Sequence, residues 1–255
     1  MKEVNVFVSG CTGNFGRRIV DLVNQHPNLK VCGGFGRKEN QYDFPVFDAD
    51  DFKKTYDFFK KQKPGLIIDV SNPTIAGTIY YYIASDFKIP LVVGTTKLDK
   101  SLILHMKSET DIPVFQAYNF LTSMRDFTKR VCDAAVSLPG YDIDIVESHH
   151  SEKVDAPSGT AKNLADAINA TLGNTHTVIP NADFNQPRGE NEIYITSIRR
   201  GDDLGTHTVT FACDGEIQEY THRVTSKDIF AKGAIRVAEF LLEQKPGYYN
   251  MDSLA

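Results

Sequence analysis

The sequence predicts an α/β fold: a parallel sheet covered by helices, joined to a smaller α+β part with a mainly antiparallel sheet. Three observations support this prediction. Short apolar runs alternate with amphipathic stretches over residues 1–120. Three long strand-like segments separated by turn residues occupy 192–225. A final segment, 229–243, returns to the apolar spacing of a helix.

The first part alternates strands with helices, and this order is typical of a parallel sheet because parallel strands need long crossover connections. The expected strands are 4–8, 30–35, 65–70, 90–93 and 113–116, and the expected helices are 15–24, 75–85 and 98–108. We expect helices on both faces of this sheet, because its strands are apolar throughout.

The pattern changes after Asn119. The expected elements are helices 122–137 and 160–171 and strands 142–147, 192–200, 206–213 and 216–225. Turn residues at 201–205 and at Asp214-Gly215 predict a meander of antiparallel hairpins. We expect helix 229–243 to pack on the first part. The predicted domains are therefore 1–120 with 230–255, and 121–229.

The composition narrows the class of protein. Of the 255 residues, 41% are hydrophobic, which is enough to bury a sizeable core. The formal net charge is -5 without a basic run, which argues against a nucleic-acid partner. Any attraction for an anionic ligand must therefore come from a local basic cluster.

The N-terminus and the cysteines indicate the compartment. The opening apolar stretch is too short for a signal peptide, and no run approaches the roughly 18 apolar residues of a membrane span. Cys11, Cys32, Cys132 and Cys213 lie far apart without a CxxC pair, so we expect reduced thiols. We therefore expect a cytoplasmic protein without a membrane partner.

A glycine-rich turn directly follows the first strand. Gly10, Gly13 and Gly16 have the spacing G-x-x-G-x-x-G and enclose Asn14 and Phe15 at the start of a helix. Glycines let the backbone approach a pyrophosphate, and the helix N-terminus offers it free N–H groups. The turn predicts a Rossmann-like nucleotide domain. A plain glycine-rich turn is the alternative, because the dinucleotide fingerprint is G-x-G-x-x-G.

The end of the second strand bears on the choice of cofactor. An NAD-specific enzyme usually places Asp or Glu here, whereas this chain has Gly36 followed by Arg37 and Lys38. Two cations suit a 2′-phosphate, so NADPH is slightly favoured over NADH. Solvated basic residues in a loop are the alternative.

The stretch from Glu147 to Ala161 joins a strand end to a helix start. His149, His150 and Lys153 supply a tunable proton donor and a fixed cation. Pro157 to Thr160 build a helix N-terminus that can bind a carboxylate. These groups suit the reduction of a carboxylated, unsaturated substrate, because an acid must quench the charge that hydride addition creates.

Two other interpretations of this stretch are a solvated surface loop and a zinc site. The loop could be surface decoration, since a histidine in a loop is often only solvated. A zinc site is disfavoured, because adjacent His149 and His150 would point in different directions and no third ligand stands nearby. We therefore expect no metal.

At these residues the sequence resembles the dihydrodipicolinate reductase (4-hydroxy-tetrahydrodipicolinate reductase) family. Its signature E-x-H-H-x-x-K-x-D-x-P-S-G-T-A is matched at every fixed position from Glu147 to Ala161. Further matches are the glycine turn, Asp69-Val70-Ser71 with Pro73, Gly94-Thr95-Thr96, Asn119-Phe120, Arg199-Arg200-Gly201-Asp202, Gly205-Thr206-His207-Thr208 and 230–236.

The resemblance implies an NAD(P)H-dependent reductase of the diaminopimelate and lysine pathway that acts on a small dianionic heterocycle. It implies that His149 is the general acid and that Lys153 binds substrate and assists protonation. His150, Lys153, Gly159 and Thr160 would hold the carboxylates. The cofactor-binding residues that it implies are Gly10, Gly13, Asn14, Phe15, Gly16, Arg37, Ser71, Gly94, Thr96, Asn119 and Phe120. It also implies a homotetramer built through the substrate-domain sheets.

One segment departs from the family pattern. Relatives usually continue Asn119-Phe120 with Ser-x-Gly-Val, whereas this chain has Leu121-Thr122-Ser123-Met124. Two other functions remain as alternatives. One is a related two-domain NAD(P)-dependent oxidoreductase, such as an aspartate dehydrogenase or a sugar-type enzyme. The other is a non-catalytic, redox-sensing NADP-binding protein.

Overall fold

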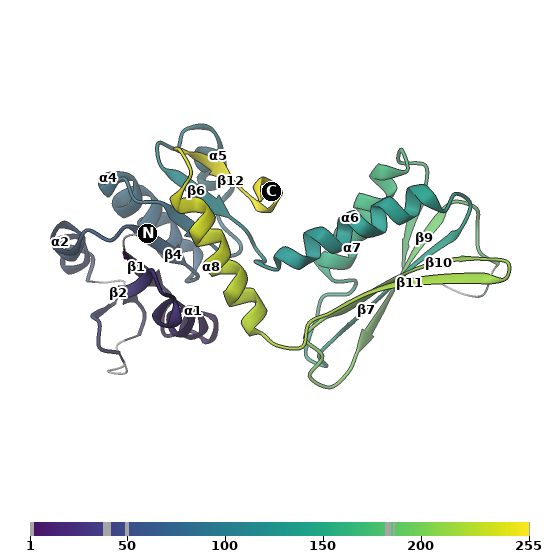
Figure 1. Cartoon of the computed structure of the whole chain (residues 1–255), viewed down its shortest axis with the longest axis horizontal. Coiled ribbons are helices and arrows are strands. Elements are labelled where there is room, and N and C mark those ends of the chain that lie inside the picture. The colour runs from purple at the N-terminus through teal and green to yellow at the C-terminus, as the bar shows by residue number, and fades with distance from the viewer. Residues whose placement is uncertain (1–2, 38–41, 49–50, 182–184, 186, 255) are drawn as a thin grey trace. The chain divides into compact units, whose positions relative to one another are not determined.

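The structure is a computed structural model that describes residues 3–37, 42–48, 51–181, 185 and 187–254. The chain divides into two compact units (Figure 1). Unit 1 comprises 1–121 and 228–255, and unit 2 comprises 122–227. The sequence analysis placed the corresponding boundaries after residues 120 and 229.

Unit 1 is built on a seven-stranded sheet in the order β12-β6-β5-β4-β1-β2-β3. Its strands are β1 (Val4–Ser9), β2 (Leu29–Phe35), β3 (Val46–Phe47), β4 (Leu66–Asp69), β5 (Leu91–Val93), β6 (Pro113–Gln116) and β12 (Gly247–Tyr249). All neighbouring strands run parallel. Strands β1 to β6 have the 3-2-1-4-5-6 order of a doubly wound nucleotide-binding sheet, so the predicted fold class is confirmed.

Helices cover both faces of this sheet. They are α1 (Asn14–Gln25), α2 (Phe52–Gln62), α3 (Pro73–Ile79), the π-helix η1 (Tyr80–Ala84), α4 (Ser85–Phe87), α5 (Lys100–Ser108), α8 (Asp228–Leu242) and the 3-10 helix η2 (Met251–Ser253). Val6 and Val8 of β1 pack with α1 and α8, while Phe7 packs with α2, α3 and α5 on the other face. The expectation that the last long helix packs on the first part is confirmed. Helix α2 was not predicted.

Unit 2 has a five-stranded sheet in the order β11-β10-β7-β9-β8. Its elements are α6 (Thr122–Ser137), β7 (Asp142–His149), α7 (Gly159–Thr171), β8 (Thr177–Pro180), β9 (Glu192–Arg199), β10 (Thr206–Cys213) and β11 (Glu216–Arg223). Helices α6 and α7 lie on one face of the sheet (Figure 1). The apolar core lies between them and the central strands.

One expected hairpin of unit 2 is wrong. Strands β9 and β10, which flank the turn at 201–205, do not pair, because β7 lies between them. Strand β7 pairs parallel with β9 and antiparallel with β10. The hairpin at Asp214-Gly215 is confirmed, since β10 and β11 are antiparallel neighbours. The apolar residues Ile143 and Ile145 require burial under the helices, and a central position for β7 supplies it.

Candidate functional site

The glycine turn of unit 1 is a place where side chains do not fit. Gly10 has φ +86, and a Cβ atom on it would lie 2.6 Å from the Val70 carbonyl oxygen. A Cβ atom on Gly16 would lie 2.0 Å from the Gly10 carbonyl oxygen. Real Cβ atoms do not approach oxygen so closely. The turn therefore depends on the absence of side chains at these positions.

Helix α1 begins directly after this turn. Gly13 is its N-cap, and within the described chain no side-chain hydrogen bond caps the helix. The first N–H groups of a helix lack intrahelical partners and carry the positive end of the helix dipole. This bare N-terminus beside the glycine backbone fits a pyrophosphate.

The ends of β4 and β5 are joined by a buried carboxylate. Asp69 is 1% exposed and accepts hydrogen bonds from Ser71 Oγ at 2.5 Å and Thr95 Oγ1 at 2.6 Å. Burial raises its pKa, although these hydrogen bonds act in the opposite direction. The backbone N–H of Gly94 donates to the Asp69 carbonyl at 2.7 Å. Predicted cofactor residues Ser71 and Gly94 therefore lie at the same edge of the sheet.

Two aromatic side chains connect the other predicted cofactor residues. The rings of Phe15 and Phe120 stack with centroids 6.3 Å apart. A Cβ atom on Gly94 would lie 2.6 Å from the Phe120 ring. Gly10, Phe15, Gly94 and Phe120 are thus brought together within unit 1, at the carboxyl ends of parallel strands, where nucleotides bind in such sheets.

The remaining predicted cofactor residues are more exposed. The backbone N–H of Arg37 donates to Thr12 Oγ1 at 3.1 Å, which ties the end of β2 to the glycine turn, and the Arg37 side chain is exposed. Asn14, Thr96 and Asn119 are also exposed. Lys38 lies outside the described residues.

The unusual segment after Phe120 starts helix α6. Asn119 Oδ1 accepts a hydrogen bond from the Leu121 N–H at 2.9 Å. Ser123 Oγ lies 3.0 Å from Nε2 of His222 on β11. In this chain a serine side chain therefore ties the start of unit 2 to the strand that ends it.

The candidate substrate site lies in unit 2, where one face of the sheet changes from apolar to charged. Ile143 and Ile145 of β7 belong to the core under α6 and α7. Side chains two residues apart in a strand share a face, so Glu147 and His149 continue this row beyond the core. The sheet register places His207 of β10 opposite Glu147 and Arg199 of β9 opposite His149.

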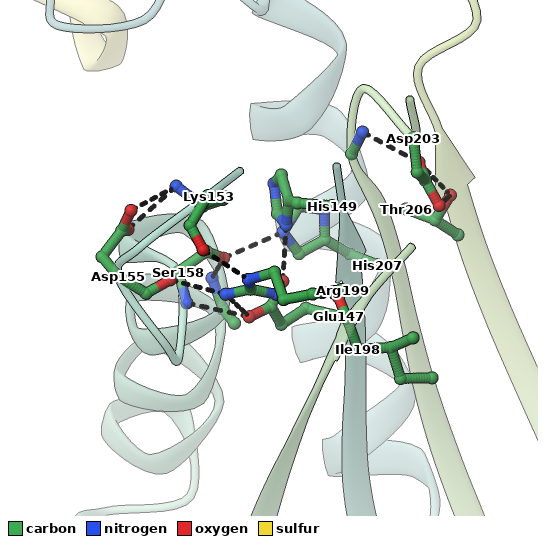
Figure 2. A network of polar contacts seen from close by, with 12 residues as sticks. Glu147, His149, Lys153, Asp155, Ser158, Ile198, Arg199, Asp203, Thr206 and His207 are labelled. Carbon is green, nitrogen blue, oxygen red and sulfur yellow. Dashed lines mark hydrogen bonds and ion pairs between the residues drawn. The ribbon is translucent and has the colours of Figure 1, made fainter. Parts of the chain in front are cut away.

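Glu147 is the centre of a polar network (Figure 2). Its carboxylate is fully buried and accepts hydrogen bonds from Arg199 Nη1 at 3.0 Å and Nη2 at 2.9 Å. His149 Nδ1 lies 2.5 Å from Oε2, and the Ser158 N–H donates to Oε1 at 3.2 Å. Burial raises the pKa of Glu147, but its hydrogen bonds, of which the one from Arg199 has the largest effect, outweigh burial and lower the pKa to about 2.

The His149 ring stands against a second histidine. The rings of His149 and His207 meet edge to face with centroids 5.3 Å apart. His207 is 4% exposed, and its Nε2 lies 3.3 Å from Ser158 Oγ. Burial, and next the charge of His149, lower the pKa of His207 to about 4. His207 is therefore neutral at neutral pH.

Lys153 and the start of α7 complete the site. Lys153 Nζ donates to both oxygens of the exposed Asp155 carboxylate, at 2.7 and 2.9 Å, and this ion pair lowers the pKa of Asp155. Ser158 caps α7 by accepting from the Ala161 N–H at 3.2 Å. Gly159 and Thr160 form the first turn of this helix.

Arg199 connects the network to the loop that carries Lys153. Its Nε donates to the Lys153 carbonyl at 3.1 Å, and its Nη2 donates to the Asp155 carbonyl at 2.5 Å. His149, Lys153 and the N-terminus of α7 are thus held by one guanidinium–carboxylate pair. His150 follows His149 at the end of β7, and its carbonyl accepts from the Lys153 N–H at 3.1 Å.

The sequence alone indicates no role for Glu147, Arg199 or His207. Each lay in a segment that matched the family, but the row of side chains appears only when β9 and β10 are placed beside β7. One signal in the sequence was available, because the alternation of apolar residues along β9 and β10 is interrupted by a charged or polar residue. Arg199 and His207 occupy positions on the same strand faces as the buried apolar residues Ile193, Ile195, Val209 and Phe211.

No helix in the described part of the chain is long and apolar enough to cross a membrane. Among the same residues, no group of three or more His, Cys, Asp and Glu side chains is arranged to hold a metal ion.

Comparison with known proteins identifies the family to which the chain belongs. The model of the dihydrodipicolinate reductase N-terminus matches residues 4–120, and that of its C-terminus matches 124–254. The chain belongs to the dihydrodipicolinate reductase family. The 4-hydroxy-tetrahydrodipicolinate reductase of Caldanaerobacter subterraneus subsp. tengcongensis is 34% identical over 253 residues, which cover 98% of each chain. That of Staphylococcus saprophyticus is 36% identical and covers 95% of this chain and 97% of the relative.

A solved structure shares the fold over the whole length. It is described as dipicolinate bound dihydrodipicolinate reductase from Paenisporosarcina sp. TG-14, with a TM-score of 0.79 and 20% identity over 99% of this chain and 100% of that one. The two family models and the curated relatives confirm the resemblance predicted from the sequence. Family membership also confirms the prediction of an oxidoreductase that uses a pyridine nucleotide.

Proposed function

We propose that this chain reduces 4-hydroxy-tetrahydrodipicolinate, with loss of water, to tetrahydrodipicolinate, and that His149 supplies the proton. The proton from His149 would neutralise the negative charge that hydride addition to one substrate carbon creates. The observation that carries the proposal is the buried Glu147–Arg199 pair, which holds His149 and the Lys153 loop together at the end of β7.

Unit 2 provides the groups that a dianion needs. The ammonium of Lys153 and the N-terminus of α7, with Gly159 and Thr160, offer positive charge and N–H donors to carboxylates. In the structure Lys153 binds the exposed carboxylate of Asp155, so a substrate carboxylate would share or replace that partner. We propose that His150 adds a further contact to the substrate.

Unit 1 provides the cofactor site. The glycine turn and the N-terminus of α1 would bind the pyrophosphate, while Ser71, Gly94, Thr96, Asn119 and Phe120 would line the nicotinamide end. A bound nicotinamide supplies the hydride. The exposed Arg37 guanidinium suits a 2′-phosphate, so we propose a preference for NADPH over NADH.

We also propose that the chain acts as a homotetramer in the cytoplasm. Helices α6 and α7 lie on one face of the unit 2 sheet in its described part, and assembly would cover the other face. Tyr194 and Val146 lie on that second face, because they alternate with the core residues of β9 and β7.

A coupled assay tests the reaction. The unstable substrate is generated in situ by its synthase, and the absorbance of NADPH or NADH is followed. We expect His149→Ala to lower kcat by about 10²- to 10⁴-fold, the usual contribution of a general acid, with a much smaller change in KM. Lys153→Ala should damage both constants, because Lys153 binds substrate as well.

The matched control is His176→Ala. His176 follows the C-terminal end of α7, whereas the candidate site lies at its N-terminal end. This variant should keep the wild-type kcat. Unchanged turnover of His149→Ala would remove the acid assignment. Nucleotide binding by the wild type without oxidation in the presence of substrate would favour the non-catalytic alternative.

A further inference from the structure

The carboxylate of Glu147 lies directly behind His149 and cannot act as a hydrogen-bond donor. It is fully buried, pairs with both terminal nitrogens of Arg199, and has a pKa lowered to about 2 by its hydrogen bonds, of which those from Arg199 have the largest effect. Glu147 is therefore ionised at any pH at which the protein would work. An ionised carboxylate only accepts hydrogen bonds.

The ionised carboxylate fixes which nitrogen of the His149 ring carries a hydrogen. Nδ1 lies 2.5 Å from Glu147 Oε2, so it must carry a hydrogen whether the ring is neutral or charged. In a neutral imidazole one nitrogen is the donor and the other the acceptor. The hydrogen that His149 gains and loses is therefore the one on Nε2.

We propose that Glu147 and Arg199 are positioning residues that lock His149 in the Nδ1–H tautomer and so make Nε2 the atom from which the proton leaves. The inference rests on the proposed role of His149 as the acid. Arg199 contributes twice: it keeps Glu147 ionised, and it binds the carbonyls of Lys153 and Asp155, which ties the loop to the same pair.

The surroundings of Nε2 support this assignment. Gly205, with φ +139, lies beside it, and a Cβ atom there would be 3.2 Å from Nε2. A side chain at position 205 would crowd this nitrogen. Asp203 holds the turn in place by accepting from the Gly205 N–H at 3.0 Å.

The charged and titratable groups around His149 come from several elements. Glu147 comes from β7, Arg199 from β9 and His207 from β10, while Lys153 and Asp203 come from loops. The buried His207 stays neutral and so does not compete for the proton. Glu147 is the group in contact with Nδ1, which makes it the one to change.

The first experiment reads the tautomer of the wild-type protein. Side-chain ¹⁵N NMR of His149, without substrate and with the ring neutral, should show Nδ1 protonated and Nε2 unprotonated. Free histidine in water favours the opposite tautomer. An Nε2–H signal in the wild type would overturn the proposal, and this measurement needs no variant to fold.

The second experiment uses Glu147→Gln. The glutamine amide can either accept from or donate to Nδ1, so it no longer dictates the tautomer. We expect a mixed or Nε2–H spectrum and a kcat lowered about 10²- to 10³-fold, within the usual range for acid catalysis, with KM within about threefold. The matched control is Glu216→Gln, since Glu216 is exposed at the β10–β11 hairpin and binds Tyr141. It should keep the wild-type kcat and spectrum.

The outcomes separate this inference from the proposed function. An active wild type whose Glu147→Gln variant keeps both kcat and the Nδ1–H signal would refute the positioning role alone. A wild type that oxidises no nucleotide would refute the proposed function, and the NMR spectrum would still decide the tautomer.

Discussion

The candidate cofactor site in unit 1 is made of backbone, whereas the candidate substrate site in unit 2 is made of charged side chains. Gly10 and Gly16 bring two chain segments so close that a single Cβ atom would clash. Glu147 and Arg199 instead place opposite charges in a site that excludes water from the carboxylate. Both arrangements prepare a site for an anion, one with free N–H groups and the other with cations.

This difference determines which kind of substitution disrupts each site. The backbone site fails when atoms are added, because there is no space for them. The charged site fails when one partner is removed or neutralised, because its buried partner is left uncompensated. Substitutions in the two units should therefore differ in both size and pH dependence.

The largest expected effect is at Gly16 in the first turn of α1, and Gly159 in the first turn of α7 is its control. We expect Gly16→Ala to destabilise the protein by more than about 4 kcal/mol, or to prevent folding, because its Cβ would meet the Gly10 carbonyl at 2.0 Å. Gly159→Ala should leave the stability within about 0.5 kcal/mol of wild type, since nothing lies within 4 Å of its Cβ position. Urea unfolding checks both, and a stable Gly16→Ala would contradict the backbone description of the unit 1 site.

The second effect is a loss of folding stability at low pH. The pKa of His207 is lowered from 6.5 to about 4, so the unfolded chain binds a proton before the folded chain does. His207 therefore contributes stability that is complete above pH 6.5 and is lost as the pH falls toward 4. The loss is on the order of 3 kcal/mol. Glu147, with a pKa lowered from 4.5 to about 2, loses its contribution over the lower range.

Denaturant unfolding of His207→Gln at pH 7 and pH 5 checks this. The variant should be less stable than wild type at pH 7 but should show a smaller difference between the two pH values. His176→Gln, at the far end of α7, should keep the wild-type difference. An unchanged pH difference in His207→Gln would show that the buried histidine is not the acid-sensitive group.

The smallest expected effect lies at the exposed edge of the unit 1 site. Arg37→Ala should raise the KM for NADPH about tenfold, which corresponds to about 1.4 kcal/mol of lost phosphate binding. The KM for NADH and the melting temperature should stay near wild type, because the side chain is exposed. Lys61→Ala on α2 is the control. Equal effects on both cofactors would argue against a contact with the 2′-phosphate.

The predictable part of the fold was the part set by local pattern. The bounds of α6, β6 and β10 are those expected, since each has a clear period and defined ends. The pairing of β9 with β10 was wrong, because the turn residues at 201–205 report that the chain reverses but not which strand lies between. Helix α2 was missed, although Thr55 and Phe59 are its buried residues.

The sequence by itself determined the glycine turn and the stretch from Glu147 to Ala161, because both sites depend on residues spaced closely along one piece of chain. Only the tertiary structure decided that Arg199, 52 positions after Glu147, pairs with it, and that His207 packs against His149. The register of β7 between β9 and β10 produces these contacts. That register follows from burying the apolar rows of all three strands under α6 and α7, a condition that no local segment contains.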